Sequence, residues 1–86
     1  MRIRYSGSAT GVVSLDGMNE VTVGRAKNSQ IRSDDSTVSR KHALVRRDAG
    51  QWIIEDLQSS HGVLLAGSKV TRHVLLVGDV LHLGTL

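Results

Sequence analysis

The sequence of 86 residues contains no cysteine, no proline and no phenylalanine, and it has a single tryptophan and a single tyrosine. Without cysteine, neither disulfides nor a thiolate zinc site can stabilise the fold, so aliphatic burial must do so. So few aromatic residues leave no stacking platform of the kind that single-strand nucleic-acid binders use. The longest apolar run, Val74–Val77, is far below the roughly 20 residues of a membrane span. We therefore expect a cytoplasmic protein that inserts into no membrane and binds no nucleic acid.

Net charge is the first feature of the sequence that points to a class of partner. Eleven Lys and Arg residues against eight Asp and Glu residues give a net charge of +3 and a pI near 10.0. Such a balance favours an anionic partner, and by itself it leaves nucleic acid, lipid headgroups and phosphorylated protein open. The length fits one domain, which we place at residues 1–86.

Short apolar runs separated by Gly, Asn, Asp and Ser indicate many short strands and no helix. Turn signals recur every 8–12 residues or so, which is typical of an all-β sandwich. A hairpin turn is expected at Asp48–Gly50 and a second turn at Leu76–Asp79. The expected strands are Arg2–Tyr5, Gly11–Leu15, Glu20–Gly24, Lys41–Arg47, Gln51–Asp56, Val63–Leu65, Lys69–Val70 and Asp79–Leu83.

Three polar clusters fall in loops between these strands, where binding residues usually collect. Gly24-Arg25 closes one strand, Val38–His42 precedes another, and Asp56–Gly62 follows a third. A Gly-Arg pair alone is a weak signal. Combined with a Ser-x-x-His about 14 residues later and a Ser-x-x-Gly about 20 residues after that, it forms a specific constellation.

This constellation resembles the forkhead-associated (FHA) family, whose pattern is Gly-Arg, then Ser-x-x-His, then Asn-Gly. The resemblance implies an FHA-type β-sandwich of about ten to eleven short strands in two sheets, and a module that binds phosphothreonine peptides without catalytic residues, metal or cofactor. It covers about residues 21–84. The matching positions are Val23-Gly24-Arg25, Asn28, Ile31, Asp35, Val38-Ser39-Arg40, His42-Ala43, Asp56-Leu57, Ser59, Gly62 and Gly78-Asp79.

The resemblance also implies a site. A phosphothreonine carries nearly two negative charges and three acceptor oxygens. An arginine fork such as that of Arg25 can donate two charge-assisted hydrogen bonds to it, and a hydroxyl such as that of Ser39 can add another. The implied phosphopeptide-binding residues are Arg25, Ser39, Arg40, Ser60 and His61, and the implied loop-supporting residues are Gly24, His42 and Gly62. The implied partner is a protein phosphorylated on threonine by a Ser/Thr kinase.

His61 departs from the family pattern, which has Asn before the glycine. The family's Asn is both donor and acceptor toward the peptide backbone, whereas a neutral imidazole offers one of each in another geometry and a charged one only donates. We expect a retained phosphate pocket with altered readout of the flanking peptide. Binding would then depend on pH near the ordinary histidine value of about 6.5.

The end of the sequence is a second departure. The family runs one further strand after Leu83-Gly84, beside the first strand, and here only Thr85-Leu86 follow. Either the sequence is a fragment or Arg2–Tyr5 lies at an open edge that can pair with another chain. The second possibility and the presence of His61 in place of Asn support an alternative function. In it, the fold is a phosphate-independent scaffold in a larger assembly, which binds or self-associates through this edge or through a face of the sandwich.

Catalytic and metal sites have weaker support in the residues. Ser39, His42 and Asp56 contain the chemistry of a hydrolase triad, but no nucleophile elbow accompanies them. The four histidines lack the tight spacing of metal ligands and have no cysteine partner. We expect no enzyme and no metal site.

Overall fold

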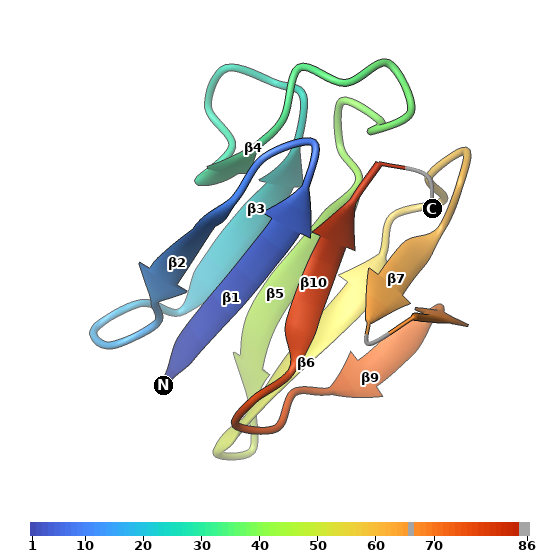
Figure 1. Cartoon of the computed structure of the whole chain (residues 1–86). Coiled ribbons are helices and arrows are strands. Elements are labelled where there is room, and N and C mark those ends of the chain that lie inside the picture. The colour runs from blue at the N-terminus through green and yellow to red at the C-terminus, as the bar shows by residue number, and fades with distance from the viewer. Residues whose placement is uncertain (66, 85–86) are drawn as a thin grey trace.

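The computed structural model describes residues 1–65 and 67–84, which form ten strands in two sheets that face one another (Figure 1). These residues contain no helix that is long and apolar enough to cross a bilayer. The strands are β1 (Arg2–Gly7), β2 (Gly11–Ser14), β3 (Glu20–Gly24), β4 (Ile31–Arg32), β5 (Ala43–Asp48), β6 (Gln51–Asp56), β7 (Val63–Leu65), β8 (Ser68–Val70), β9 (Arg72–Val74) and β10 (Val80–Leu83).

Each sheet has five strands. The first sheet has the order β2-β1-β10-β7-β8, and the second has the order β4-β3-β5-β6-β9. Most neighbours are antiparallel, whereas β1 with β10 and β3 with β4 are parallel. This arrangement confirms the all-β sandwich expected from the spacing of turn signals.

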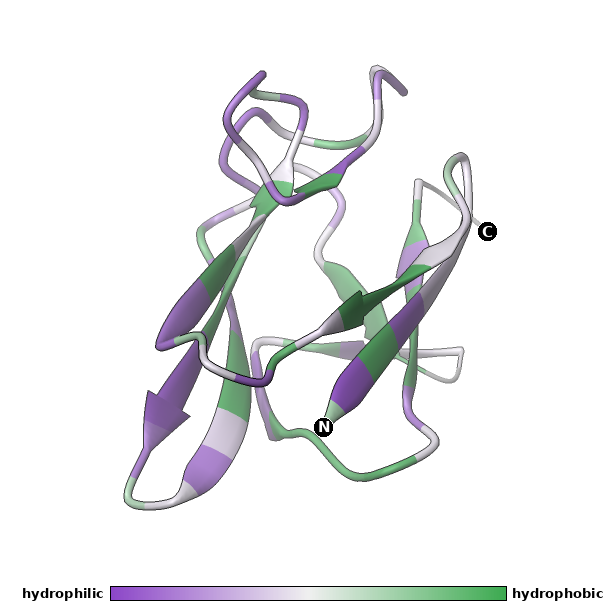
Figure 2. Ribbon diagram, turned by 90° about the vertical axis from the view of Figure 1, so that its left-hand side faces the viewer, coloured by the Kyte–Doolittle hydropathy of each residue, from purple (hydrophilic) through white to green (hydrophobic). Residues whose placement is uncertain are grey.

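The hydrophobic core lies between the two sheets, and Figure 2 shows hydrophobic and hydrophilic residues following one another along the strands. Alternation along the strands produces it, since successive side chains point to opposite faces. In β3, Val21 and Val23 are buried and the intervening Thr22 is half-buried. Trp52 and Ile54 of β6 enter the same core, and Leu81 and Leu83 of β10 meet them from the other sheet. Full burial of each such side chain stabilises the fold by roughly 1.5–3 kcal/mol.

Both predicted turns are present. β5 runs through Asp48 and β6 begins at Gln51, so the hairpin turns at Ala49 and Gly50 with φ of 50° and 79°. Two successive positive φ values are typical of a type I′ turn, whose twist matches that of paired strands. At the second turn, the Asp79 amide donates to the Leu76 carbonyl at 3.0 Å.

Some strand boundaries and two short strands differ from the prediction. β5 begins at Ala43 instead of Lys41. The strands β4 and β9 were not predicted, since two or three residues are too few to display alternation. Both form at sheet edges, where they pair with β3 and β6 respectively.

The expectation of an open edge at Arg2–Tyr5 is wrong. β1 pairs on one side with β2, where Ile3 lies opposite Val13, and on the other with β10, where Tyr5 lies opposite Leu81. The physical reason is that backbone groups need hydrogen-bond partners, and β10 runs parallel to β1 within pairing distance. Within the described residues, the sheet edges are β2, β8, β4 and β9. Thr85 and Leu86 lie outside these residues.

Candidate functional site

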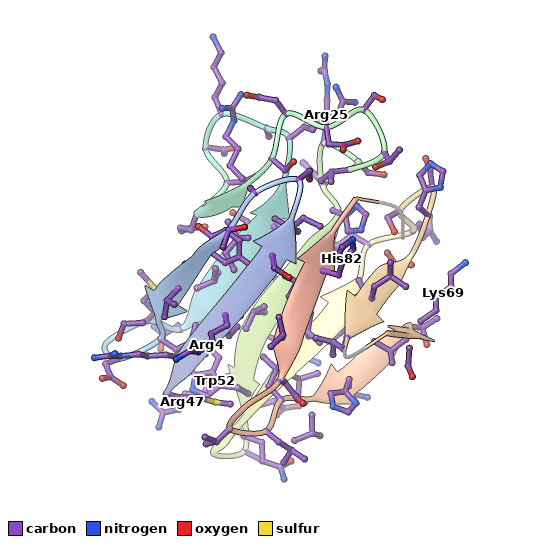
Figure 3. All side chains as sticks on the ribbon, viewed as in Figure 1. Arg4, Arg25, Arg47, Trp52, Lys69 and His82 are labelled. Carbon is purple, nitrogen blue, oxygen red and sulfur yellow. The ribbon has the colours of Figure 1, made fainter. Side chains whose placement is uncertain are left out.

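Three loops carry the polar clusters: residues 25–30 between β3 and β4, 33–42 between β4 and β5, and 57–62 between β6 and β7. The first two extend beyond the sheets at the upper end of the molecule in Figure 1. Figure 3 shows Arg25 at this same end, away from Arg4, Arg47 and Trp52. Rigid strands below the loops therefore fix where the polar side chains are displayed.

The first two loops are joined through their backbones beside Gly24. The Arg25 amide donates to the Ser39 carbonyl at 3.1 Å, and the Ala26 amide donates to the Arg40 carbonyl at 3.3 Å. Gly24 is buried under this contact, and a Cβ placed there would overlap the Arg40 carbonyl. Glycine is therefore required at position 24, because any side chain would push the two loops apart.

The guanidinium of Arg25 is held in one orientation. Its Nε donates to the Val38 carbonyl at 2.7 Å, and the side chain is half-buried. This bond uses the inner edge of the planar group, which leaves the two terminal nitrogens to donate to an incoming acceptor. They border a cavity of about 420 Å³ that is lined by Arg25, Ala26, Lys27, Arg32, Asp34 and Arg40.

His42 connects the second and third loops from beneath. Its side chain is 4% exposed. Nδ1 accepts from the Ser39 amide at 3.0 Å, and Nε2 lies 2.7 Å from the Gly62 carbonyl. Only the neutral tautomer with its proton on Nε2 satisfies both contacts, so we assign that tautomer from the hydrogen-bond network. With both ring nitrogens engaged by backbone groups, His42 contacts no serine hydroxyl and forms no pair with Asp56.

Ser39 and the third loop meet directly. The Ser60 amide donates to the Ser39 hydroxyl at 3.0 Å, so this oxygen accepts and its own proton remains available for a ligand. Farther along, the Gly62 amide donates to the Ser59 hydroxyl at 2.9 Å, and the Ser59 amide donates to Asp56 at 3.0 Å. Gly62 has a φ of 80°, which a residue with a side chain adopts only under strain.

His61 is exposed in the third loop. The pKa of Asp35 in the second loop is lowered from its usual value, chiefly because the hydroxyl and then the amide of Thr37 donate to its carboxylate. The charge of His61 contributes a further, smaller lowering. His61 is thus open to solvent, and its effect on Asp35 is small.

Comparisons with known proteins identify the family. The sequence model of the FHA domain family matches residues 21–84 of this chain. The chain belongs to the FHA family. It is 32% identical over 79 residues to the FHA domain-containing protein FhaB of Mycobacterium tuberculosis, a match that covers 91% of this chain and 51% of FhaB. The chain spans between 12% and 51% of the length of the first curated relatives that it matches.

Solved FHA domains share the fold. The FhaA FHA domain, which was solved in complex with an intracellular domain of another protein, has a TM-score of 0.75 and 30% identity. That match covers 88% of this chain and 82% of the FhaA chain. An FHA domain studied for its phosphothreonine-dependent interactions has a TM-score of 0.72 and 30% identity, over 88% of this chain and 76% of that one.

The FHA fold brings together most of the residues that the sequence singled out. Hydrogen bonds connect Gly24 and Arg25 to the loop of Ser39, and connect Ser39 to Ser60. Arg40 shares the cavity wall with Arg25. Among the described residues, the His61 side chain forms no hydrogen bond or ion pair with this group.

Two cations of the cavity wall were missed by sequence reasoning. Lys27 comes from the β3–β4 loop, and Arg32 comes from the unpredicted strand β4. Neither belongs to the FHA pattern, so the only signal in the sequence was the excess of basic residues. The Arg32 guanidinium donates to the Arg25 carbonyl at 3.2 Å and pairs with Asp34 at 2.7 Å, which positions it beside the loop of Arg25.

Proposed function

We propose that this FHA domain, acting as one unit over residues 1–86, is an adaptor that binds phosphothreonine in partner proteins. The observation that carries the proposal is the guanidinium of Arg25, which the Val38 carbonyl holds in place and which lines a cationic cavity. Ser39 is not in the cavity wall, but its carbonyl accepts from the Arg25 amide. Phosphothreonine-dependent interaction in a solved relative of the same fold supports it. In this proposal the module mediates protein–protein interaction after a Ser/Thr kinase has acted, and it does so in the cytoplasm.

The chemistry of the loops matches a phosphate dianion. Arg25 donates from two terminal nitrogens, Arg40 adds a second positive charge, and the Ser39 hydroxyl donates the proton left by its contact with Ser60. The Ser60 hydroxyl is a further donor on the facing loop. Two or three charge-assisted hydrogen bonds at roughly 1.5–3 kcal/mol each supply much of the roughly 8 kcal/mol of a micromolar dissociation constant.

His61 contacts the peptide backbone beside the phosphothreonine in this proposal. Its ring is exposed at the binding end and has one donor and one acceptor when neutral. These are the two functions that the family's asparagine amide provides at this position. The loop that carries His61 is anchored on both sides, by the Ser60 amide to Ser39 and by the Gly62 carbonyl to His42.

A binding role explains the loops better than a catalytic role. Both ring nitrogens of His42 form hydrogen bonds with backbone groups, and Asp56 accepts from the Ser59 amide, so neither residue is placed to activate Ser39. The alternative of a phosphate-independent scaffold drew on an open edge at Arg2–Tyr5, on a sandwich face and on His61 in place of Asn. The pairing of Arg2–Tyr5 on both sides removes the first of these supports. Phosphopeptide binding is therefore the function that the described contacts favour.

A degenerate phosphothreonine peptide library, with its unphosphorylated counterpart, tests the proposal by fluorescence anisotropy. We expect micromolar binding that requires the phosphate. Arg25→Ala removes at least two charge-assisted donors, so it should weaken binding by about 100-fold or more. Arg4→Ala is the matched control, because it removes one charge at the opposite end of the molecule (Figure 3).

Phosphate-independent binding, or equal losses in the two arginine variants, would refute the proposal. Nucleic acid is a useful competitor in the same assay. A nucleic-acid binder loses affinity steeply with added salt, whatever the nucleic-acid sequence. The proposed site instead binds different phosphopeptides with different affinities at one salt concentration. Far-ultraviolet circular dichroism of each variant verifies that the sandwich is intact.

A further inference from the structure

The cavity beside Arg25 carries more positive charge than one phosphate requires. Four cations line it, namely Arg25, Lys27, Arg32 and Arg40, together with the single carboxylate of Asp34. Four positive charges less one negative charge leave a net charge of +3 on the wall. A phosphothreonine brings about −1.5 to −2 at neutral pH, so about one positive charge or more remains without a counterpart.

Arg32 is held in the cavity wall by two contacts. Its Nε donates to the Arg25 carbonyl at 3.2 Å, and its terminal nitrogen lies 2.7 Å from Asp34. The side chain of Asp34 is 81% exposed, so water and salt screen this ion pair and it neutralises Arg32 weakly. A phosphate or carboxylate that enters the cavity competes with Asp34 for the Arg32 guanidinium, and the screened ion pair that it replaces is weak.

Elsewhere within the described residues, Arg46 and Arg72 have a carboxylate within ion-pair distance, whereas five other cations, Arg2, Arg4, Lys41, Arg47 and Lys69, have none. On the outer face of the second sheet, Arg46 contacts the carboxylates of both Glu55 and Asp48. Within residues 1–65 and 67–84, Lys27, Arg25 and Arg40 have no carboxylate within ion-pair distance. The positive charge of the cavity is therefore concentrated where a ligand can reach it and is not neutralised by the fold.

We propose that Lys27 and Arg32 form a second anion subsite, so that the preferred ligand carries a second phosphate or carboxylate close to its phosphothreonine. The inference rests on the proposed function and specifies the class of peptide. A sphere of 420 Å³ is about 9 Å across, and an extended chain advances about 3.3 Å per residue. The second anion consequently lies within about three residues of the phosphothreonine.

The experiment compares three peptide sets at about 0.15 M salt. The first is a phosphothreonine peptide with neutral flanks, the second adds a phosphothreonine at each position from about −3 to +3, and the third places aspartate at those positions. We expect a second phosphate at one position or more to lower Kd by about tenfold or more. Aspartate, with a single charge and fewer acceptor oxygens, should give about two- to fivefold at the same position.

The gain is defined as the Kd of the singly phosphorylated peptide divided by the Kd of the doubly phosphorylated peptide on the same protein. It is then measured on variants. Lys27→Ala and Arg32→Gln should each reduce the gain by at least about threefold, and Lys27→Glu should reverse it into a loss of affinity. Lys27 is exposed, so these substitutions leave the core intact. Arg4→Ala changes the net charge equally at the far end and should leave the gain unchanged, which separates a local subsite from general attraction.

Three outcomes overturn the inference. The first is that a second anion increases affinity at no position. The second is that the gain is the same in the Lys27 and Arg32 variants as in the native chain. The third is that Arg4→Ala reduces the gain as much as those variants do. In each of these cases singly phosphorylated peptides still bind, so the proposed function survives. If neither singly nor doubly phosphorylated peptides bind the folded domain, the proposed function fails and the inference fails with it.

Discussion

Replacing His42 with alanine is the sharpest test of how the loops are organised. The substitution removes the acceptor of the Ser39 amide and the donor to the Gly62 carbonyl, and it deletes a ring that is 4% exposed. Each backbone group left without a partner costs about 1–3 kcal/mol, with the lower end for Ser39 because that contact is only partly buried. Together with the void left by the ring, we expect a loss of about 2–5 kcal/mol.

The loss is large relative to the stability of a small domain. At about 0.05–0.15 kcal/mol per residue, a chain of 86 residues has about 4–13 kcal/mol in total. Urea unfolding followed by tryptophan fluorescence measures the change. Trp52 is the only tryptophan and is 9% exposed, so its emission reports directly on the core.

Two conservative variants separate the contributions of the two hydrogen bonds of His42. His42→Asn keeps an acceptor near the position of Nδ1, and His42→Gln keeps a donor near the position of Nε2, so each should recover part of the stability lost in His42→Ala. Phosphopeptide affinity should follow the same order, because Ser39 is positioned through His42. If His42→Ala lowers the free energy of unfolding by less than about 1 kcal/mol, or if Asn and Gln are no better than Ala, the bracing argument is wrong.

Three further predictions concern single positions. Gly24→Ala should lower Tm and weaken phosphopeptide binding together, because its Cβ overlaps the Arg40 carbonyl, and unchanged thermal melting would contradict this. Asp35→Asn should destabilise the fold at pH 7. Since contacts with Thr37 lower the pKa of Asp35, that contribution is present above its ordinary value of 3.8 and disappears as the pH falls through the lowered pKa, so urea midpoints of variant and native chain should converge in acid. His61→Asn should abolish any change in peptide affinity that the native chain shows between about pH 5.5 and 7.5, beyond the change caused by the phosphate itself, and titrations of both chains with one peptide test this.

The longer strands and the binding loops were readable from the sequence for related reasons. In β3 and β6, alternating apolar residues identify both the strand and its buried face, because one side of each strand faces the core. The site residues were implied by the resemblance to the FHA pattern. The structure gives a physical reason for that pattern at Gly24, Arg25 and His42, because each performs a task that few other residues can perform.

The remaining features depend on contacts that no local pattern encodes. β4 and β9 are strands only because β3 and β6 offer them free edges, and the neighbour of β1 is set by a strand almost at the other end of the sequence. Lys27 and Arg32 become neighbours of Arg25 only once β4 is in place beside β3. Here the tertiary arrangement, and not the residue type, decides the role.

The parallel pairing of β1 with β10 also bears on when each part of the protein can form. The second sheet grows through connections of modest length, since the β5–β6 hairpin is local and β3 joins β5 directly. The first sheet closes only when Ser8 meets Leu83, 75 residues away in sequence. Closing so long a loop is entropically costly and slow. During synthesis, the sheet that supports Arg25 and His42 can therefore assemble before the first sheet is complete. Until β10 has been made, the edge of β1 opposite β2 lacks its hydrogen-bond partner.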